Sequence, residues 1–151
     1  MLGSMPLDDV VQYGQTKAQE IQERRQRRRI ADEKASVDGR LKTIWAPKIW
    51  EQVCEEITQL VQSINDALGE DALQCDEDSA GMVTIRLADI PSNLSATFDP
   101  STGRFILTLN DHLETFNLEV VRGEVKLKAV GYFSPRQLAK MLVDKAASMV
   151  L

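Results

Sequence analysis

Residues 45–69 read W-A-P-K-I-W-E-Q-V-C-E-E-I-T-Q-L-V-Q-S-I-N-D-A-L-G, and the expected fold is organised around them. Eight apolar residues recur here at steps of one, three or four, which places them on one stripe of a helix: Trp50, Val53, Cys54, Ile57, Leu60, Val61, Ile64 and Leu68. Pro47 suits the first turn of such a helix, and Gly69 can close it in the left-handed conformation. The pattern therefore predicts an amphipathic helix between these two residues.

Beyond Gly69 the apolar residues alternate with polar ones, which is the period of a strand with one buried face. Five such runs are expected: Met82–Ala88, Asn93–Asp99, Arg104–Asn110, Thr115–Val121 and Val125–Val130. A short sixth strand is expected before them, at Leu73–Cys75. The predicted inner face includes Val83, Leu107 and Leu118. Because the connections are short, we expect consecutive strands to pair antiparallel in a five- to six-stranded meander.

Residues 134–137, S-P-R-Q, predict the start of a last helix, with serine as the N-cap, proline at the first position and glutamine at the third. Its apolar residues are Leu138, Met141, Leu142 and Met149. We expect this helix and the first one to pack on the same face of the sheet. The predicted fold class is α+β, with residues 45–151 as a single domain. The arrangement is similar to that of small bacterial secretion chaperones, although those proteins usually interrupt the sheet with a helix.

Residues 1–44 have a different composition, and Met1–Ser4 are interpreted as a possible cloning remnant. Residues 5–44 hold nine basic and seven acidic side chains, a net charge of +2, whereas the whole chain carries −5 and the remainder therefore −7. Helix-forming residues dominate, and three acid-first pairs have i, i+4 spacing: Glu20/Arg24, Glu23/Arg27 and Asp38/Lys42. We expect a charged, solvated helical arm with a break near Gly39.

Two features of this arm suggest contacts with a partner. Ile30, Val37 and Ile44 repeat every seven residues with Leu41 beside them, but two heptads are too few to predict a coiled coil. The run R-R-Q-R-R-R contains five arginines: Arg24, Arg25, Arg27, Arg28 and Arg29. These arginines could form a solvated helix face, contact an acidic protein surface on this or another chain, or bind the phosphates of a nucleic acid. The last interpretation is less favoured, because acidic residues flank the run and no aromatic residue is present for base stacking.

The sequence contains no catalytic or metal-binding motif. The single histidine, His112, is expected in a loop near Asp111 and Glu114. Cys54 is expected in the core and Cys75 is not placed, so a disulfide between them stays open. The acidic run Asp76, Glu77 and Asp78 lacks the alternating oxygen ligands and the glycine of a calcium-binding loop. It is interpreted as a polar turn. We predict no enzymatic activity, no cofactor and no metal.

Length and hydropathy limit the cellular setting. The 151 residues correspond to about one domain, and no apolar run approaches the ~20 residues needed to span a bilayer. The first thirty residues lack the apolar segment of a signal peptide, and two cysteines are too few for a disulfide framework. We therefore expect a cytoplasmic protein that does not bind a membrane.

Three hypotheses about function follow. The first is a non-catalytic protein–protein interaction module, of the adaptor or chaperone type, that assembles through its helical arm with a protein partner or a second copy. The second is nucleic-acid binding through the five arginines. The third is a small apolar ligand held between the sheet and its helices, which ranks lower because bulky inner residues are expected to fill that space.

Overall fold

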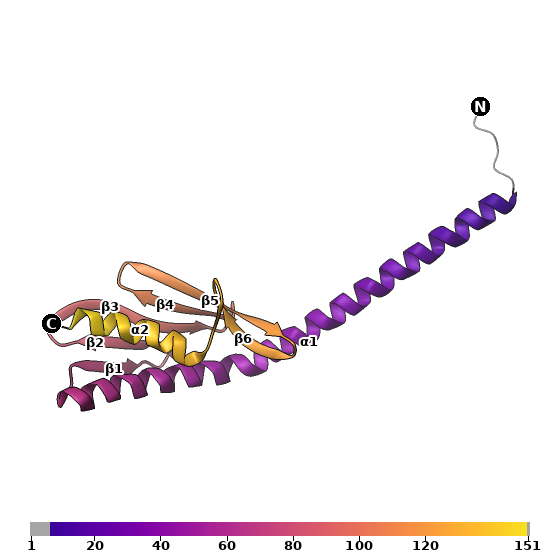
Figure 1. Ribbon diagram of the computed structural model, residues 1–151. Coiled ribbons are helices and arrows are strands. Elements are labelled where there is room, and N and C mark those ends of the chain that lie inside the picture. The colour runs from indigo at the N-terminus through magenta and orange to yellow at the C-terminus, as the bar shows by residue number, and fades with distance from the viewer. Residues whose placement is uncertain (1–6, 151) are drawn as a thin grey trace. The chain divides into compact units, whose positions relative to one another are not determined.

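The computed structural model describes residues 7–150, which form two helices and seven strands (Figure 1). In chain order the elements are α1 Leu7–Leu68, β1 Leu73–Glu77, β2 Val83–Leu87, β3 Ile90–Asp99, β4 Arg104–Leu109, β5 His112–Val121, β6 Glu124–Lys128, β7 Tyr132–Phe133 and α2 Pro135–Met149. The possible cloning remnant Met1–Ser4 and the last residue, Leu151, lie outside the described residues. The chain divides into two compact units, one up to Gly39 and one from Arg40 onward.

The strands form an antiparallel meander in which each strand pairs with the next one along the chain. The α+β class and the antiparallel sheet are therefore confirmed, but the sheet has seven strands rather than five or six. The strand that the prediction lacks is β7, whose Tyr132 and Phe133 pair with Lys128 and Leu127 of β6. Two residues are too few to display an alternating pattern, so periodicity does not reveal this strand.

Two strands begin earlier than predicted, because the turn before each of them contains only two residues. Leu87 pairs with Ile90 across a two-residue turn, so β3 begins at Ile90 rather than at the predicted Asn93. His112 likewise pairs with Leu109 and opens β5, so the predicted loop position of this histidine is wrong. Asp89 and Asn110 supply the positive φ of these turns, at 64° and 59°, a conformation that short polar side chains tolerate.

Helix α1 continues through both positions where the sequence predicts a boundary. The expected break near Gly39 and the expected start at Pro47 are both wrong, because each residue lies inside the helix. An interior proline costs ~3 kcal/mol, since it lacks an N–H and crowds the preceding turn. Ile49 and Val53 are buried directly after it, and burial of such side chains contributes ~1.5–3 kcal/mol each, which offsets this cost. The predicted end is confirmed, as Gly69 has a φ of 72°.

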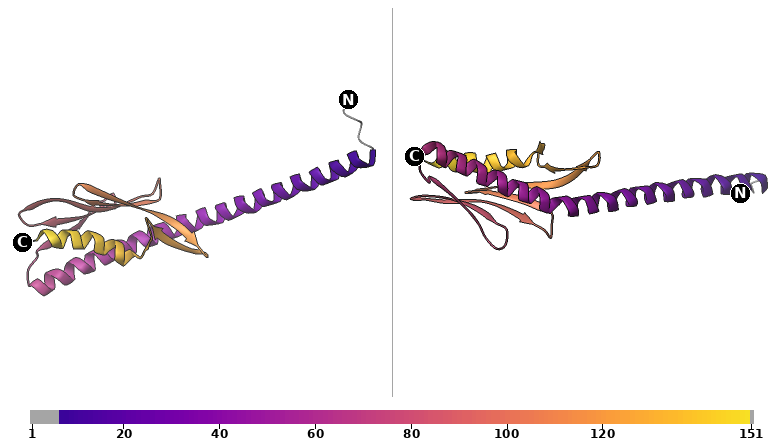
Figure 2. Two further views of the ribbon diagram at one scale, coloured as in Figure 1. Left: turned by 45° about the horizontal axis from the view of Figure 1, so that its top comes forward. Right: turned by 90° about the horizontal axis from the view of Figure 1, so that it is seen from below.

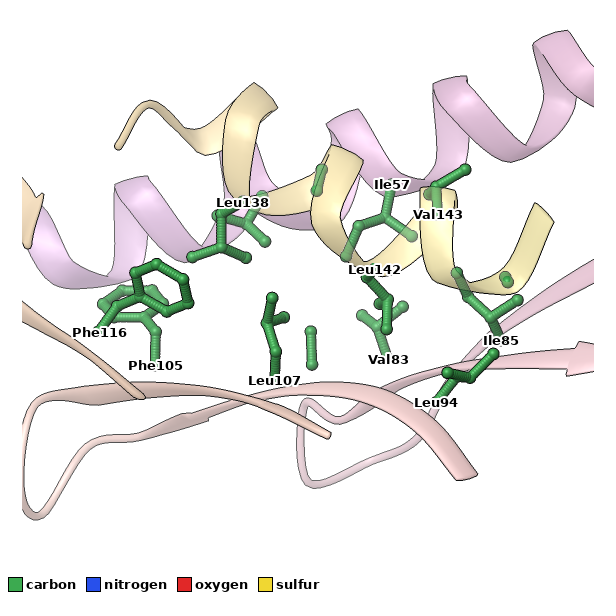
Figure 3. Close-up of a cluster of buried hydrophobic side chains, with 14 of the residues drawn as sticks. Ile57, Val83, Ile85, Leu94, Phe105, Leu107, Phe116, Leu138, Leu142 and Val143 are labelled. Carbon is green, nitrogen blue, oxygen red and sulfur yellow. The ribbon is translucent and has the colours of Figure 1, made fainter. Parts of the chain in front are cut away.

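The core lies between one face of the sheet and two helices, α2 and the second half of α1, which run side by side (Figure 2). Ile57 of α1 and Leu142 of α2 both point toward the strand residues Val83 and Leu107 (Figure 3). The predicted inner residues Val83, Leu107 and Leu118 are buried, with exposed fractions of 1%, 0% and 8%. The predicted packing of the sheet's apolar face is therefore confirmed.

The buried row of α1 differs from the predicted stripe. It consists of five residues: Ala46, Ile49, Val53, Ile57 and Val61. Four predicted members are only half-buried: Trp50, Cys54, Leu60 and Ile64. Leu68 is exposed. The helix face that meets the sheet is narrower than the full apolar stripe, although the Trp50 ring still packs against Phe98 and Phe105 at centroid distances of 6.4 and 6.1 Å.

The predicted start of α2 is confirmed. The backbone N–H of Gln137 donates to Oγ of Ser134 at 3.1 Å, and the backbone N–H of Ser134 donates to Oε1 of Gln137 at 2.8 Å. This reciprocal capping box satisfies donors that the first turn of the helix leaves unpaired. Arg136, also in this turn, forms an ion pair with Glu56 of α1 at 2.9 Å and so links the two helices.

The edge strand β1 is held by a side chain of α1. The Asn65 amide donates from Nδ2 to the carbonyl of Leu73 at 2.8 Å, and the Leu73 N–H donates to Oδ1 of Asn65 at 3.1 Å. Asn65 thereby occupies the N–H and C=O of Leu73, two of the backbone groups that an edge strand would otherwise present to another chain. The pair also ties the end of α1 to the first residue of the sheet.

We expect Asn65→Ala to lower the free energy of unfolding by about 1–3 kcal/mol, because the half-buried asparagine provides both hydrogen bonds to Leu73. Urea denaturation of the full chain measures this change. Gln62→Ala, an exposed residue on the same helix, is the matched control and should cost less than ~0.5 kcal/mol. Equal destabilisation by the two substitutions would contradict the role assigned to Asn65.

Candidate functional site

The arginines predicted to contact a partner lie together on α1 and are exposed: Arg24, Arg25, Arg27, Arg28 and Arg29. We call them the arginine block. Within residues 7–150 none of them forms an ion pair. The predicted pair of Glu20 with Arg24 does not form, and Glu20 instead binds Nζ of Lys17 at 3.2 Å. The block therefore presents five positive charges to solvent without a bound carboxylate.

A second group on the same helix is an apolar row that the sequence-based prediction missed. It consists of six residues, which we call the N-terminal patch: Leu7, Val10, Val11, Gly14, Ala18 and Ile21. Leu7, Gly14 and Ile21 are seven residues apart, and the others stand at the offsets of three or four that keep them on the same face. The signal is present in the sequence, but Gly14 at the middle position hides it when only large aliphatic residues are counted.

The large side chains of the N-terminal patch are exposed. Their exposed fractions are 78% for Leu7, 49% for Val10, 50% for Val11 and 47% for Ile21. No residue between 7 and 39 is buried. An apolar row on one face of a helix ordinarily lies against another surface, so this row is the strongest candidate for a contact with a partner.

The arginine block ends the apolar row. Arg24 and Arg28 follow Ile21 by three and seven residues, so they occupy the same face as the N-terminal patch. Ile30 follows Ile21 by nine residues, about two and a half turns, and therefore points to the opposite side of the helix. The predicted repeat of Ile30 and Val37 is thus not a continuation of the patch, although both residues are exposed.

His112 makes an exposed hydrogen bond with the carboxylate of Glu114 and has no nucleophile among its contacts in the described part of the chain. Its Nε2 lies 2.6 Å from Oε1 of Glu114. His112 does not contribute to the pKa shift of either cysteine, Cys54 or Cys75. Among residues 7–150 there is also no group of three or more histidine, cysteine or acidic side chains placed to hold a metal ion.

The two cysteines are free, half-buried thiols on neighbouring elements, α1 and β1. Burial, followed by the negative charge of Glu77, raises the pKa of Cys54 to about 12. Burial also raises the pKa of Cys75, while a hydrogen bond with Thr58 opposes that shift. Because the thiolate is the reactive form, both thiols are poor nucleophiles at neutral pH.

An open groove of about 410 Å³ lies in the second unit, between α1 and the end of the sheet formed by β6 and β7. Ile49, Leu127 and Phe133 contribute apolar walls, and the exposed rings of Trp45 and Tyr132 form part of its lining. The groove lies at the surface, whereas the hypothesis of an apolar ligand places the ligand between the sheet and the helices. That interior space is occupied by core side chains (Figure 3).

Comparison with known proteins yields no match: no protein-family model, no curated protein and no solved structure matches this chain. Within the described residues, neither helix is long and apolar enough to cross a membrane.

The raised pKa of Cys54 predicts slow alkylation of this residue in the folded protein. At pH 8.5 a thiol with a pKa of about 12 is a thiolate several hundred times less often than one with the ordinary value of 9.0. We expect iodoacetamide to modify Cys54 at least about a hundred times more slowly in buffer than in guanidinium chloride, measured by mass spectrometry of the peptides. A rate within tenfold of the denatured control would contradict the burial assigned to this thiol.

The same shift gives the sign of a pH effect on stability. Because the folded-state pKa of Cys54 lies above its ordinary value, the folded protein retains the thiol proton more strongly than the unfolded chain does. The contribution of this group to stability is therefore complete below about pH 9 and decreases as the pH rises toward 12.

Proposed function

We propose that the protein is a non-catalytic protein–protein interaction module that assembles through its helical arm. The N-terminal patch is the observation that supports this proposal. Its four large apolar side chains are 47–78% exposed and lie on one face of a helix in which no residue from 7 to 39 is buried. An isolated helix is only marginally stable in water, so such an arm gains stability from a partner that covers this row.

The size of the patch sets the strength of the expected association. Full burial of a leucine, isoleucine or valine side chain contributes ~1.5–3 kcal/mol, so four such residues on each of two helices offer ~12–24 kcal/mol at most. Burial in a helix pair is incomplete, and association itself costs ~4–15 kcal/mol. The net free energy is therefore modest, and assembly should depend on protein concentration over the micromolar range.

Light scattering on the full chain and on a shortened chain that begins at Arg40 tests this proposal. We expect the full chain to exceed its monomer mass of 16.9 kDa increasingly as concentration rises. The shortened chain, which retains the second compact unit, should remain a monomer at all concentrations. Identical monomeric masses for both chains would overturn assembly through the arm.

The arginine block supports nucleic-acid binding as a second candidate function. The supporting observation is that none of its five guanidinium groups is paired with a carboxylate in the described part of the chain. Unpaired arginines on one helix can neutralise phosphates and release the counterions that surround a nucleic acid.

Replacement of all five arginines of the block by glutamine tests this candidate. Each lost phosphate contact should reduce the slope of log K against log salt by ~0.7–0.9, as measured by fluorescence anisotropy with labelled RNA and DNA. Lys34→Gln removes one charge from the same helix outside the block. It should change the slope by no more than ~0.7–0.9, the value for a single phosphate contact. If the unmodified protein binds neither RNA nor DNA at low salt, this second candidate is excluded.

A further inference from the structure

We infer that two copies of this chain bind each other through the N-terminal patch as an antiparallel helix pair centred on Gly14. This inference rests on the proposed assembly function and deepens it, because it names the partner, the surface and the orientation. The partner is a second copy of the chain, and the six residues of the patch form the apolar part of the contact in each copy. Such a self-complementary contact is the kind that a twofold axis produces.

The patch is complementary to itself when the two helices run in opposite directions about Gly14. In that register Leu7 of one copy lies opposite Ile21 of the other, and Val10 lies opposite Ala18. Gly14 meets its own copy at the centre, where the lack of a side chain allows the backbones to approach closely. A Cβ atom built on Gly14 has no neighbour within 4 Å in the single chain, so nothing within the chain itself requires glycine there.

The remaining contact in this register involves Lys17, which lies opposite Val11. Lysine can cover an apolar neighbour with its methylene groups while its ammonium group remains in water. The Lys17 Nζ is already held at the edge of the row, 3.2 Å from Glu20 and 5.7 Å from the centre of the Tyr13 ring. This lysine therefore forms part of the polar rim and does not have to be buried as a charge.

The arginine block decides between the two possible orientations. A parallel pair in register would extend the contact into Arg24 and Arg28, which occupy the same face as the patch. It would also place the blocks of the two copies side by side, ~8–10 Å apart, which is about one Debye length at physiological salt. Like charges at that separation repel, so the parallel arrangement is disfavoured.

The antiparallel arrangement separates these charges. Arg24 is ten residues from Gly14, so the Arg24 side chains of the two copies begin about 30 Å apart along the helix axis. That distance exceeds three Debye lengths at physiological salt, and the repulsion is largely screened. Both orientations overlap the apolar residues, but only the antiparallel one also keeps the arginine blocks apart.

A spin label at Gln26 of the full chain tests the orientation. The label is attached to Gln26→Cys in a chain that also carries Cys54→Ala and Cys75→Ala, and the distance between the two copies is measured by pulsed electron paramagnetic resonance. Gln26 is twelve residues from Gly14, so we expect a distance of about 35–40 Å. A distance below about 20 Å, as a parallel pair would give, overturns the inference.

A matched pair of substitutions tests the surface. Ile21 belongs to the patch, whereas Ile30 lies on the opposite side of the helix, and the two are exposed to similar extents, 47% and 58%. We expect Ile21→Gln to weaken the dimer at least about tenfold in sedimentation equilibrium and Ile30→Gln to change its Kd less than about twofold. Equal effects of the two substitutions would overturn the assignment of the patch as the contact.

The results also separate this inference from the proposed function. If removal of the arm abolishes assembly while the Gln26 distance is short, only the antiparallel orientation is wrong. If removal of the arm abolishes assembly while Ile21→Gln has no effect, the arm assembles through a surface other than the N-terminal patch, and the inference is wrong while assembly through the arm stands. If the full chain and the chain that begins at Arg40 are both monomeric, the pairing and the proposed assembly function are both wrong.

Discussion

Burial of a single face of the sheet beneath two helices is the constraint on which the second unit depends. The largest fully buried side chains come from both layers and include Phe105 and Phe116 of the strands and Leu142 of α2. Because side chains alternate along a strand, a shift of one residue would move every inner residue to the opposite face, so this burial also sets the register of the sheet. The capping box at Ser134 and the amide of Asn65 act at the ends of this layer, where they fix the start of α2 and the free edge of β1.

This constraint explains which parts of the fold the sequence predicts. Residues that alternate over five or more positions, as around Val83 or Leu107, are confirmed because the core imposes the same period that the strand has. The short strand β7 is not predictable in this way, since it depends on pairing with β6 rather than on a pattern of its own. Pro47 is predicted at a helix start by local preference, but the packing of Ile49 and Val53 against the sheet outweighs that preference.

The candidate site could be predicted only in part from the sequence, because it depends on side-chain conformations rather than on burial in the core. The arginines are evident from composition, but whether flanking carboxylates neutralise them depends on side-chain conformations that spacing does not determine. Glu20 has Arg24 four residues ahead and Lys17 three residues behind, and it binds the lysine. The relation between Ile21, Arg24 and Arg28 becomes clear only when the residues are placed on a continuous helix, where all three share a face.

The two halves of α1 show how one helix can be maintained by two different means. Between Ala46 and Val61 the helix is stabilised by burial, which tolerates even a proline. Between residues 7 and 39 nothing is buried, and the helix relies on its propensity and on one ion pair in this range, Lys17 with Glu20. A glycine inside such an exposed helix is unfavourable, because it destabilises the helix by ~1 kcal/mol relative to alanine. Gly14 nevertheless stands at the centre of the exposed apolar row, the one position where a second helix could approach most closely. Gly14 thus weakens an unpaired helix but favours close contact between two helices, which is the combination expected of an arm that pairs.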